Sequence, residues 1–123
     1  MNIAWVDGGC QGNGSKSAKS YGSYKINDEQ IVQLTYSLDE ACTNNEAEYV
    51  TLIRCLTEIR ERELNDMTIH MDSALVVNQV VGKWAVNAPG LYTLNRQAKW
   101  LVEVTQVKLI WVPRKQIVEV LGH

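Results

Sequence analysis

The 123-residue sequence predicts an α/β domain with five strands in a mixed sheet. Short runs rich in β-branched and aromatic residues, bounded by turn residues, indicate the strands. One longer segment, 42–63, instead has apolar residues at helical spacing. The order of these segments, three strands and a helix followed by further alternating strands and helices, is typical of a mixed sheet.

The first part of the chain contains three predicted strands. Residues 1–6 form an apolar run that we expect to end at Asp7-Gly8-Gly9. A loop rich in Gly, Ser and Asn follows. Two further runs, 21–26 and 31–38, have strand character, and the residues between them are expected to form a hairpin turn.

The first predicted helix begins at a capping signal. Thr43 is followed three positions later by Glu46, which is the spacing of a capping box. Beyond this point apolar residues recur every three positions and make one helical face: Ala47, Val50, Ile53, Leu56 and Ile59. The helix is therefore expected to start at Thr43.

The second part of the chain alternates strands and helices. The expected elements are a strand, two helices and a final strand: 67–71, 73–82, 91–104 and 107–112. Gly82 acts as a helix stop, Pro89-Gly90 precede the second helix, and Pro113 prevents the last strand from continuing in a central position. Three tryptophans in apolar segments are expected in the core: Trp5, Trp100 and Trp111.

Size and composition limit the possible functions. The length suits one domain over residues 1–123 with a single core. The net charge of −2 gives no overall electrostatic footprint for nucleic acid, so binding would need local patches. No run reaches membrane-spanning length and no signal-peptide layout is present, so we expect a cytoplasmic protein without membrane contact. The scattered cysteines favour reduced thiols.

Three acids stand where a sheet edge could bring them together. Asp7 and Asp72 each follow an apolar strand. If these strands are parallel neighbours, about 4.8 Å apart, their carboxylates crowd one spot at the carboxyl edge. Glu48 lies in the first turns of the capped helix and can face the same edge. The alternative is a surface glutamate favoured by the helix dipole.

Carboxylates without a His or Cys cluster point to a hard divalent cation, Mg²⁺ or Mn²⁺. Close anions repel one another, and a bound cation relieves that repulsion. Two such ions, about 4 Å apart, activate water and stabilise the leaving oxygen in phosphoryl transfer. Metal-dependent phosphodiester chemistry is therefore the reaction that these acids would serve.

Several motifs resemble those of type 1 ribonuclease H in order and spacing: "VDGGCQGNG", "TNNEAEY" and "MDSALVVNQVVGKW". The strand end "WVPR" resembles the small bacterial and archaeal members, and the resemblance covers nearly the whole chain. It implies the α/β ribonuclease H fold, a five-stranded mixed sheet of three antiparallel and two parallel strands flanked by helices. It also implies endonucleolytic hydrolysis of the RNA strand of RNA–DNA hybrids by a two-metal-ion mechanism. The products would carry 5′-phosphate and 3′-hydroxyl ends. We further expect a monomer with no obligate protein partner.

The resemblance also implies roles for single residues. Asp7, Glu48 and Asp72 match three of the family's four metal-binding acids. The residues expected to bind the hybrid are Gly8, Cys10, Gly12, Asn13, Thr43, Asn44, Asn45, Lys83 and Trp84. Many members carry a long basic handle, of which only Lys83-Trp84 and a short loop remain here, so modest affinity is expected. No separate N-terminal hybrid-binding domain is expected.

The fourth acid depends on how the C-terminal segment is aligned. In the resembling family a helix with an Ala-Asp-x-Leu-Ala pattern follows the last strand, and its aspartate is the fourth ligand. Counting without a gap puts Leu121 there, whereas a loop shorter by two residues puts Glu119 there. We favour Glu119, because this alignment keeps apolar positions apolar and supplies a carboxylate.

Two other functions remain compatible with the sequence. One is a non-catalytic nucleic-acid-binding module of the same fold, which the state of the fourth acid would distinguish from an enzyme. The other is a related metal nuclease acting on DNA, since the fold hosts several chemistries. The segment Thr43-Asn44-Asn45 argues against the latter, because it matches RNA-reading positions.

Overall fold

The computed structural model describes residues 1–13 and 15–122; Gly14 and His123 lie outside the described residues. Within this range the elements are β1 (Asn2–Gln11), β2 (Lys19–Ile26), β3 (Val32–Tyr36), α1 (Asn44–Glu61), β4 (Met67–Met71), α2 (Ala74–Val80), α3 (Pro89–Thr105), β5 (Lys108–Trp111) and α4 (Arg114–Leu121). The strands form one sheet in the order β3-β2-β1-β4-β5. None of the described helices is long and apolar enough to cross a bilayer.

The predicted mixed sheet is confirmed by the strand pairings. β1 pairs antiparallel with β2, and β2 antiparallel with β3. On the other side, β1 pairs parallel with β4 and β4 parallel with β5. The central strand β1 therefore separates an antiparallel half of the sheet from a parallel half.

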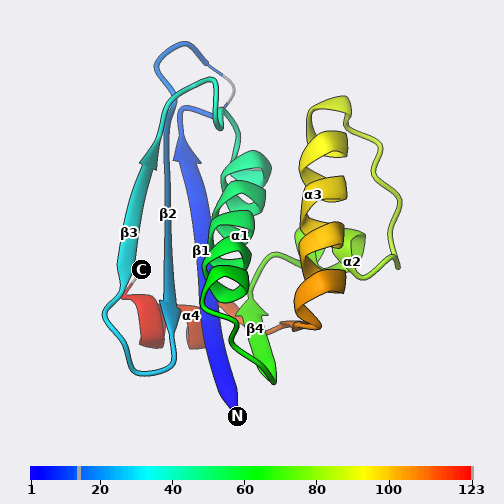
Figure 1. Ribbon diagram of the computed structural model, residues 1–123. Helices are drawn as coiled ribbons and strands as arrows, with labels where there is room; N and C mark the ends of the chain where they lie inside the picture. The colour runs from blue at the N-terminus through cyan, green and yellow to red at the C-terminus, as the bar shows by residue number, and fades with distance from the viewer. Residues whose placement is uncertain (14, 123) are drawn as a thin grey trace.

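Helices cover both faces of the sheet. α1 and α3 lie side by side on one face, and α4 lies on the other (Figure 1). The side chains of β1 alternate accordingly: Ala4 and Val6 belong to the main core with α1, whereas Trp5 packs against the smaller cluster that contains Ile117 of α4. The sheet is thus the middle layer between a large core and a small one.

β1 runs further than its sequence predicts. Its parallel pairing with β4 ends at Val6↔Met71, but its antiparallel pairing with β2 continues to Gln11↔Lys19. The expected strand end at Asp7 is therefore wrong, because β2 keeps the glycine-rich segment extended. Asp7 lies instead at a fork, where β1 continues and β4 stops. Asp72 directly follows β4, as expected.

The start of α1 agrees with its sequence signal. The Thr43 hydroxyl accepts a hydrogen bond from the Glu46 N–H at 3.1 Å, and the Glu46 carboxylate accepts from the Thr43 N–H at 3.0 Å. Both halves of the predicted capping box are therefore confirmed.

The core positions expected for two tryptophans are wrong. Trp100 and Trp111 are each about half exposed. Trp100 lies on the outer side of α3, where the Arg60 guanidinium stacks 4.9 Å from its ring centroid. Trp111 lies on the edge strand β5, and its indole N–H donates to the backbone oxygen of Asp72 at 3.2 Å.

Gly8 lets α1 approach β1 very closely. A Cβ atom at this position would lie 2.6 Å from the carbonyl oxygen of Ala47 and 2.9 Å from the backbone nitrogen of Glu48. These are backbone atoms, which cannot turn away as a flexible side chain can. The missing side chain at Gly8 therefore sets how near the first turns of α1 come to the fork.

We expect Gly8→Ala to lower the free energy of unfolding by about 1–3 kcal/mol, because the added methyl group must push α1 away from β1. Urea unfolding measures this change. The matched control is Gly90→Ala near the start of α3, where the Cβ would meet only the flexible Glu46 carboxylate at 3.2 Å. That control should lose no stability, since Ala is favoured over Gly in helices. Equal stability of Gly8→Ala and wild type would contradict the close contact.

Candidate active site

Three carboxylates meet at the fork in the sheet. Asp7 comes from β1, Asp72 from the end of β4 and Glu48 from α1. One oxygen from each lies within 4.8 Å of the others. Asp7 and Glu48 are buried, and the Asp72 side chain is only 8% exposed. The structure thus brings together the three acids that the sequence singles out.

Glu48 is held in place by the strand beneath it. Its Oε1 atom accepts a hydrogen bond from the Gly8 N–H at 3.1 Å, beyond the point where β4 pairs with β1. Its Oε2 atom is buried and receives no hydrogen bond from the described residues. Burial raises the pKa of the Glu48 carboxyl far above its usual range, and the negative charge of Asp7 raises it further. In the absence of a cation, both effects favour the protonated form of Glu48.

The positively charged side chain of Arg114 contacts two of the acids. The Arg114 Nη1 atom at the start of α4 lies 2.9 Å from Asp72 Oδ2 and 3.9 Å from Asp7 Oδ1. The hydrogen bond to Asp72 raises the pKa of Arg114, with a further contribution from the charge of Asp7. Arg114 is not among the site residues expected from the sequence. The sequence order could have suggested Arg114, because residues that follow the parallel strands β4 and β5 lie at the same edge of the sheet.

The carboxylate cluster fits a hard divalent cation. Oxygens on opposite sides of an octahedral Mg²⁺ lie about 4.2 Å apart, which is comparable with the separation of the three carboxylates. The buried Glu48 oxygen without a hydrogen bond offers a further coordination position. The ligand set contains only oxygen, as Mg²⁺ and Mn²⁺ prefer.

Glu119 does not join this cluster. Its side chain is exposed on α4, and the acid group found among the described residues consists of Asp7, Glu48 and Asp72. The α4 residue that contacts the acids is Arg114. The assignment of Glu119 as a fourth metal ligand therefore stays a prediction.

The residues after Asp7 are bonded to the start of α1. The Cys10 N–H donates to the Asn44 side-chain oxygen at 2.6 Å, and the Asn44 N–H donates to the Asn13 side-chain oxygen at 2.7 Å. Gly12 has a φ of +71°, which favours glycine at this turn. These contacts build one rim beside the acids, where an open hollow of about 430 Å³ also reaches Asn44 and Asn45.

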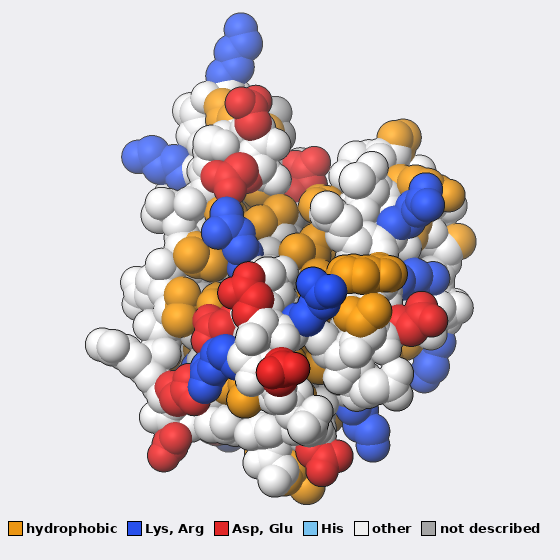
Figure 2. Space-filling view, in the orientation of Figure 1, with side chains coloured by type: hydrophobic (Ala, Val, Ile, Leu, Met, Phe, Trp, Pro, Cys, Tyr) orange, Lys and Arg blue, Asp and Glu red, His pale blue; other side chains and the backbone are white. Residues whose placement is uncertain are grey.

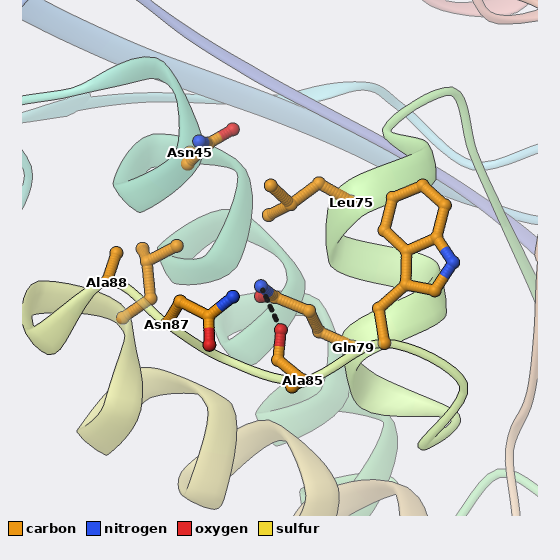
Figure 3. Close-up of a pocket in the computed structure, with 8 residues that line it drawn as sticks. Asn45, Leu75, Gln79, Ala85, Asn87 and Ala88 are labelled. Atoms are coloured by element: carbon orange, nitrogen blue, oxygen red, sulfur yellow. Dashed lines mark hydrogen bonds between the residues drawn. The ribbon is translucent and has the colours of Figure 1, made fainter.

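A second hollow, of about 490 Å³, is drawn in Figure 3 and shares Asn45 with the first. Leu75 and Gln79 of α2 and the loop residues Asn87 and Ala88 line it from the other sides. Trp84, half exposed, also contributes to its wall.

A buried chain of hydrogen bonds supports this second hollow. The Asn95 amide donates to the Tyr49 hydroxyl at 3.0 Å, and that hydroxyl donates to Gln79 Oε1 at 2.7 Å. The Gln79 amide then donates to the Ala85 carbonyl at 3.3 Å. The chain joins α3, α1 and α2 to the loop before α3. The sequence does not predict this chain of hydrogen bonds, because helical spacing alone does not show that the side chains of Tyr49, Gln79 and Asn95 meet.

Basic and aromatic side chains gather beside this loop. Lys83 and Trp84 line a hollow together with Tyr92, Arg96 and Lys99. Figure 2 shows acidic and basic side chains mixed on the α1 side of this face, with basic side chains prevailing on the α3 side. The chain thus has a local basic patch although its net charge is negative.

Comparisons with known proteins agree with this architecture. A family model described as reverse transcriptase-like matches residues 6–120. The bifunctional protein Rv2228c of Mycobacterium tuberculosis is 31% identical over 110 residues, which is 89% of this chain and 30% of that protein. The chain therefore spans less than a third of the length of this relative.

Solved structures show the same fold. LC11-RNase H1, solved in complex with an RNA/DNA hybrid, has a TM-score of 0.81 at 25% identity, covering 97% of this chain and 90% of that one. The N-terminal RNase H domain of Rv2228c has a TM-score of 0.79 at 29% identity, covering 96% and 86% of the two chains. The expected ribonuclease H fold and the resemblance to type 1 ribonuclease H are confirmed, and the chain belongs to the reverse transcriptase-like family.

Proposed function

We propose that this chain is a metal-dependent endonuclease that hydrolyses the RNA strand of RNA–DNA hybrids and leaves 5′-phosphate and 3′-hydroxyl ends. The observation that carries the proposal is the convergence of Asp7, Glu48 and Asp72 at the sheet fork. The likeness to ribonuclease H structures, one of them solved with a hybrid, supports the substrate class.

In this proposal Asp7, Glu48 and Asp72 hold two Mg²⁺ or Mn²⁺ ions, with Glu119 as the candidate fourth ligand. When bound, such ions lower the pKa of an attacking water and stabilise the charge on the leaving oxygen. Glu48 gives up its proton on loading and keeps its hydrogen bond from Gly8, which fixes its orientation. The burial of Asp7 and Glu48 keeps bulk water from these carboxylates.

The substrate would lie across the two hollows that share Asn45. On one side, the rim formed by Gly8, Cys10, Gly12 and Asn13 faces the start of α1. Backbone and amide groups there can reach the wide, shallow minor groove, where the 2′-hydroxyl marks RNA. Asn44 belongs to the same rim, and Thr43 directly precedes it as the N-cap of α1.

On the other side, the basic patch offers a second contact for the substrate. Lys83 can pair with a phosphate, and Trp84 presents a half-exposed ring on which a base or sugar can pack. The patch is small, which agrees with a modest contribution to hybrid affinity.

The first prediction concerns substrate and metal. The protein should cleave labelled RNA–DNA hybrid with Mg²⁺ or Mn²⁺, but neither duplex DNA nor duplex RNA, and chelator should stop the reaction. Asp7→Asn should lower cleavage by about a hundredfold or more, because it removes a ligand charge. The control Asp28→Asn, an exposed acid in the β2–β3 turn, should keep full activity. Hybrid binding without cleavage would support the non-catalytic module instead.

Glu119→Gln tests the fourth ligand. The variant should cleave hybrid much more slowly, with a larger loss in Mg²⁺ than in Mn²⁺, since Mg²⁺ demands a more nearly ideal ligand set. Initial rates at matched metal concentrations measure the difference. Glu103→Gln, which changes an exposed acid of α3, serves as the control. Full activity of Glu119→Gln would mean that the site works with three acids.

The raised pKa of Glu48 predicts a pH dependence of stability in the metal-free protein. The folded chain keeps a proton that the unfolded chain releases above about pH 4.3, so the contribution of Glu48 to stability is lost as pH rises from there toward its folded pKa. Glu48→Gln cannot ionise, and at pH 8 it should be more stable than wild type. Thermal unfolding in chelator from about pH 5 to 8 measures this, and parallel curves for the two proteins would contradict it.

A further inference from the structure

Arg114 places a positive charge where the proposed metal ions must bind. Its Nη1 atom lies 2.9 Å from Asp72 Oδ2 and 3.9 Å from Asp7 Oδ1, so one guanidinium contacts two of the three acids. The Arg114 side chain is 63% exposed, whereas the side chains of Asp7 and Asp72 are 3% and 8% exposed. An exposed cation thus covers buried anions.

The electrostatics of the cluster explain why this contact forms. Asp7 and Asp72 have little access to water, and an oxygen of the Glu48 carboxyl lies within 4.8 Å of both of them. Buried anions without a counter-charge are costly. The guanidinium provides that charge from α4, a separate element that is joined to β5 by only two residues.

The same geometry makes simultaneous binding of the guanidinium and a metal ion unfavourable. A divalent ion held by Asp7 and Asp72 would lie within a few ångströms of the guanidinium, where like charges repel. The hydrogen bond from Arg114 also occupies an oxygen of Asp72. Because the Arg114 side chain is 63% exposed, the guanidinium can move away while the buried acids stay fixed.

We propose that Arg114 is an internal competitor of the divalent cations: it neutralises Asp7 and Asp72 in the metal-free protein and is displaced when metal binds. This inference rests on the proposed metal site. It makes Arg114 a determinant of metal affinity, in addition to the carboxylates that supply the ligands. It also couples two equilibria, because whatever Arg114 contributes to the stability of the metal-free protein opposes metal binding by the same amount.

The test is direct titration with metal, without nucleic acid. Wild type and Arg114→Gln are titrated with Mg²⁺ by calorimetry and with Mn²⁺ by electron paramagnetic resonance. Arg114→Gln keeps a hydrogen-bond donor but loses the charge, and it should bind metal about tenfold more tightly. Arg114→Lys keeps the charge and should stay close to wild type. Lys115→Gln is the matched control: it removes a neighbouring charge of α4 that takes part in no ion pair found among the described residues.

Thermal unfolding supplies a second readout. In chelator, Arg114→Gln should melt below wild type, because the acids lose their counter-charge, and saturating Mn²⁺ should raise its Tm by more than it raises that of wild type. Metal binding by wild type with unchanged affinity in Arg114→Gln would overturn the inference and leave the proposed function standing. No metal binding by any of these proteins would overturn the proposed function, and this inference with it.

Discussion

Like charges buried at the fork of the sheet are the constraint around which this chain is built. Asp7, Glu48 and Asp72 come from a strand, a helix and a strand end, and their oxygens lie within 4.8 Å of one another. In a medium of low dielectric, such a group is stable only if its charge is compensated. The guanidinium of Arg114 provides a positive charge beside Asp7 and Asp72, while burial and the charge of Asp7 raise the pKa of Glu48 and favour its neutral form.

The two faces of the sheet contribute differently to this arrangement. The large core on the α1 side fixes Glu48, since α1 carries fully buried residues such as Leu52 and Leu56 and begins with a complete capping box. The small cluster on the other side holds α4 chiefly through Ile117 and Leu121. Glu48 is therefore held by the larger core. Arg114, which supplies the counter-charge, is exposed on a helix that is held by the smaller cluster.

Local signals account for most of what the sequence predicts correctly. Thr43 and Glu46 mark the helix start, and the apolar run before Asp72 marks β4, because both signals depend on neighbours in the chain. Long-range pairing explains what is missed. β1 continues through glycines, which strands usually avoid, since β2 pairs with them. The contact between Arg114 and Asp72 likewise depends on tertiary packing. The role of Glu119 stays a prediction.

The hydrogen bond from Gln79 to Ala85 bears on how such domains can diversify. This hydrogen bond holds the loop between α2 and α3 at Ala85. Gly82, earlier in the same loop, has a φ of +88°, and a Cβ atom added there would have no neighbour within 4 Å among the described residues. Residues inserted beside Gly82 would extend outward without disturbing the buried polar chain or the acids. Under the proposed function, nucleic-acid contact through this loop and cleavage at the acids are then traits that insertion and substitution can vary independently.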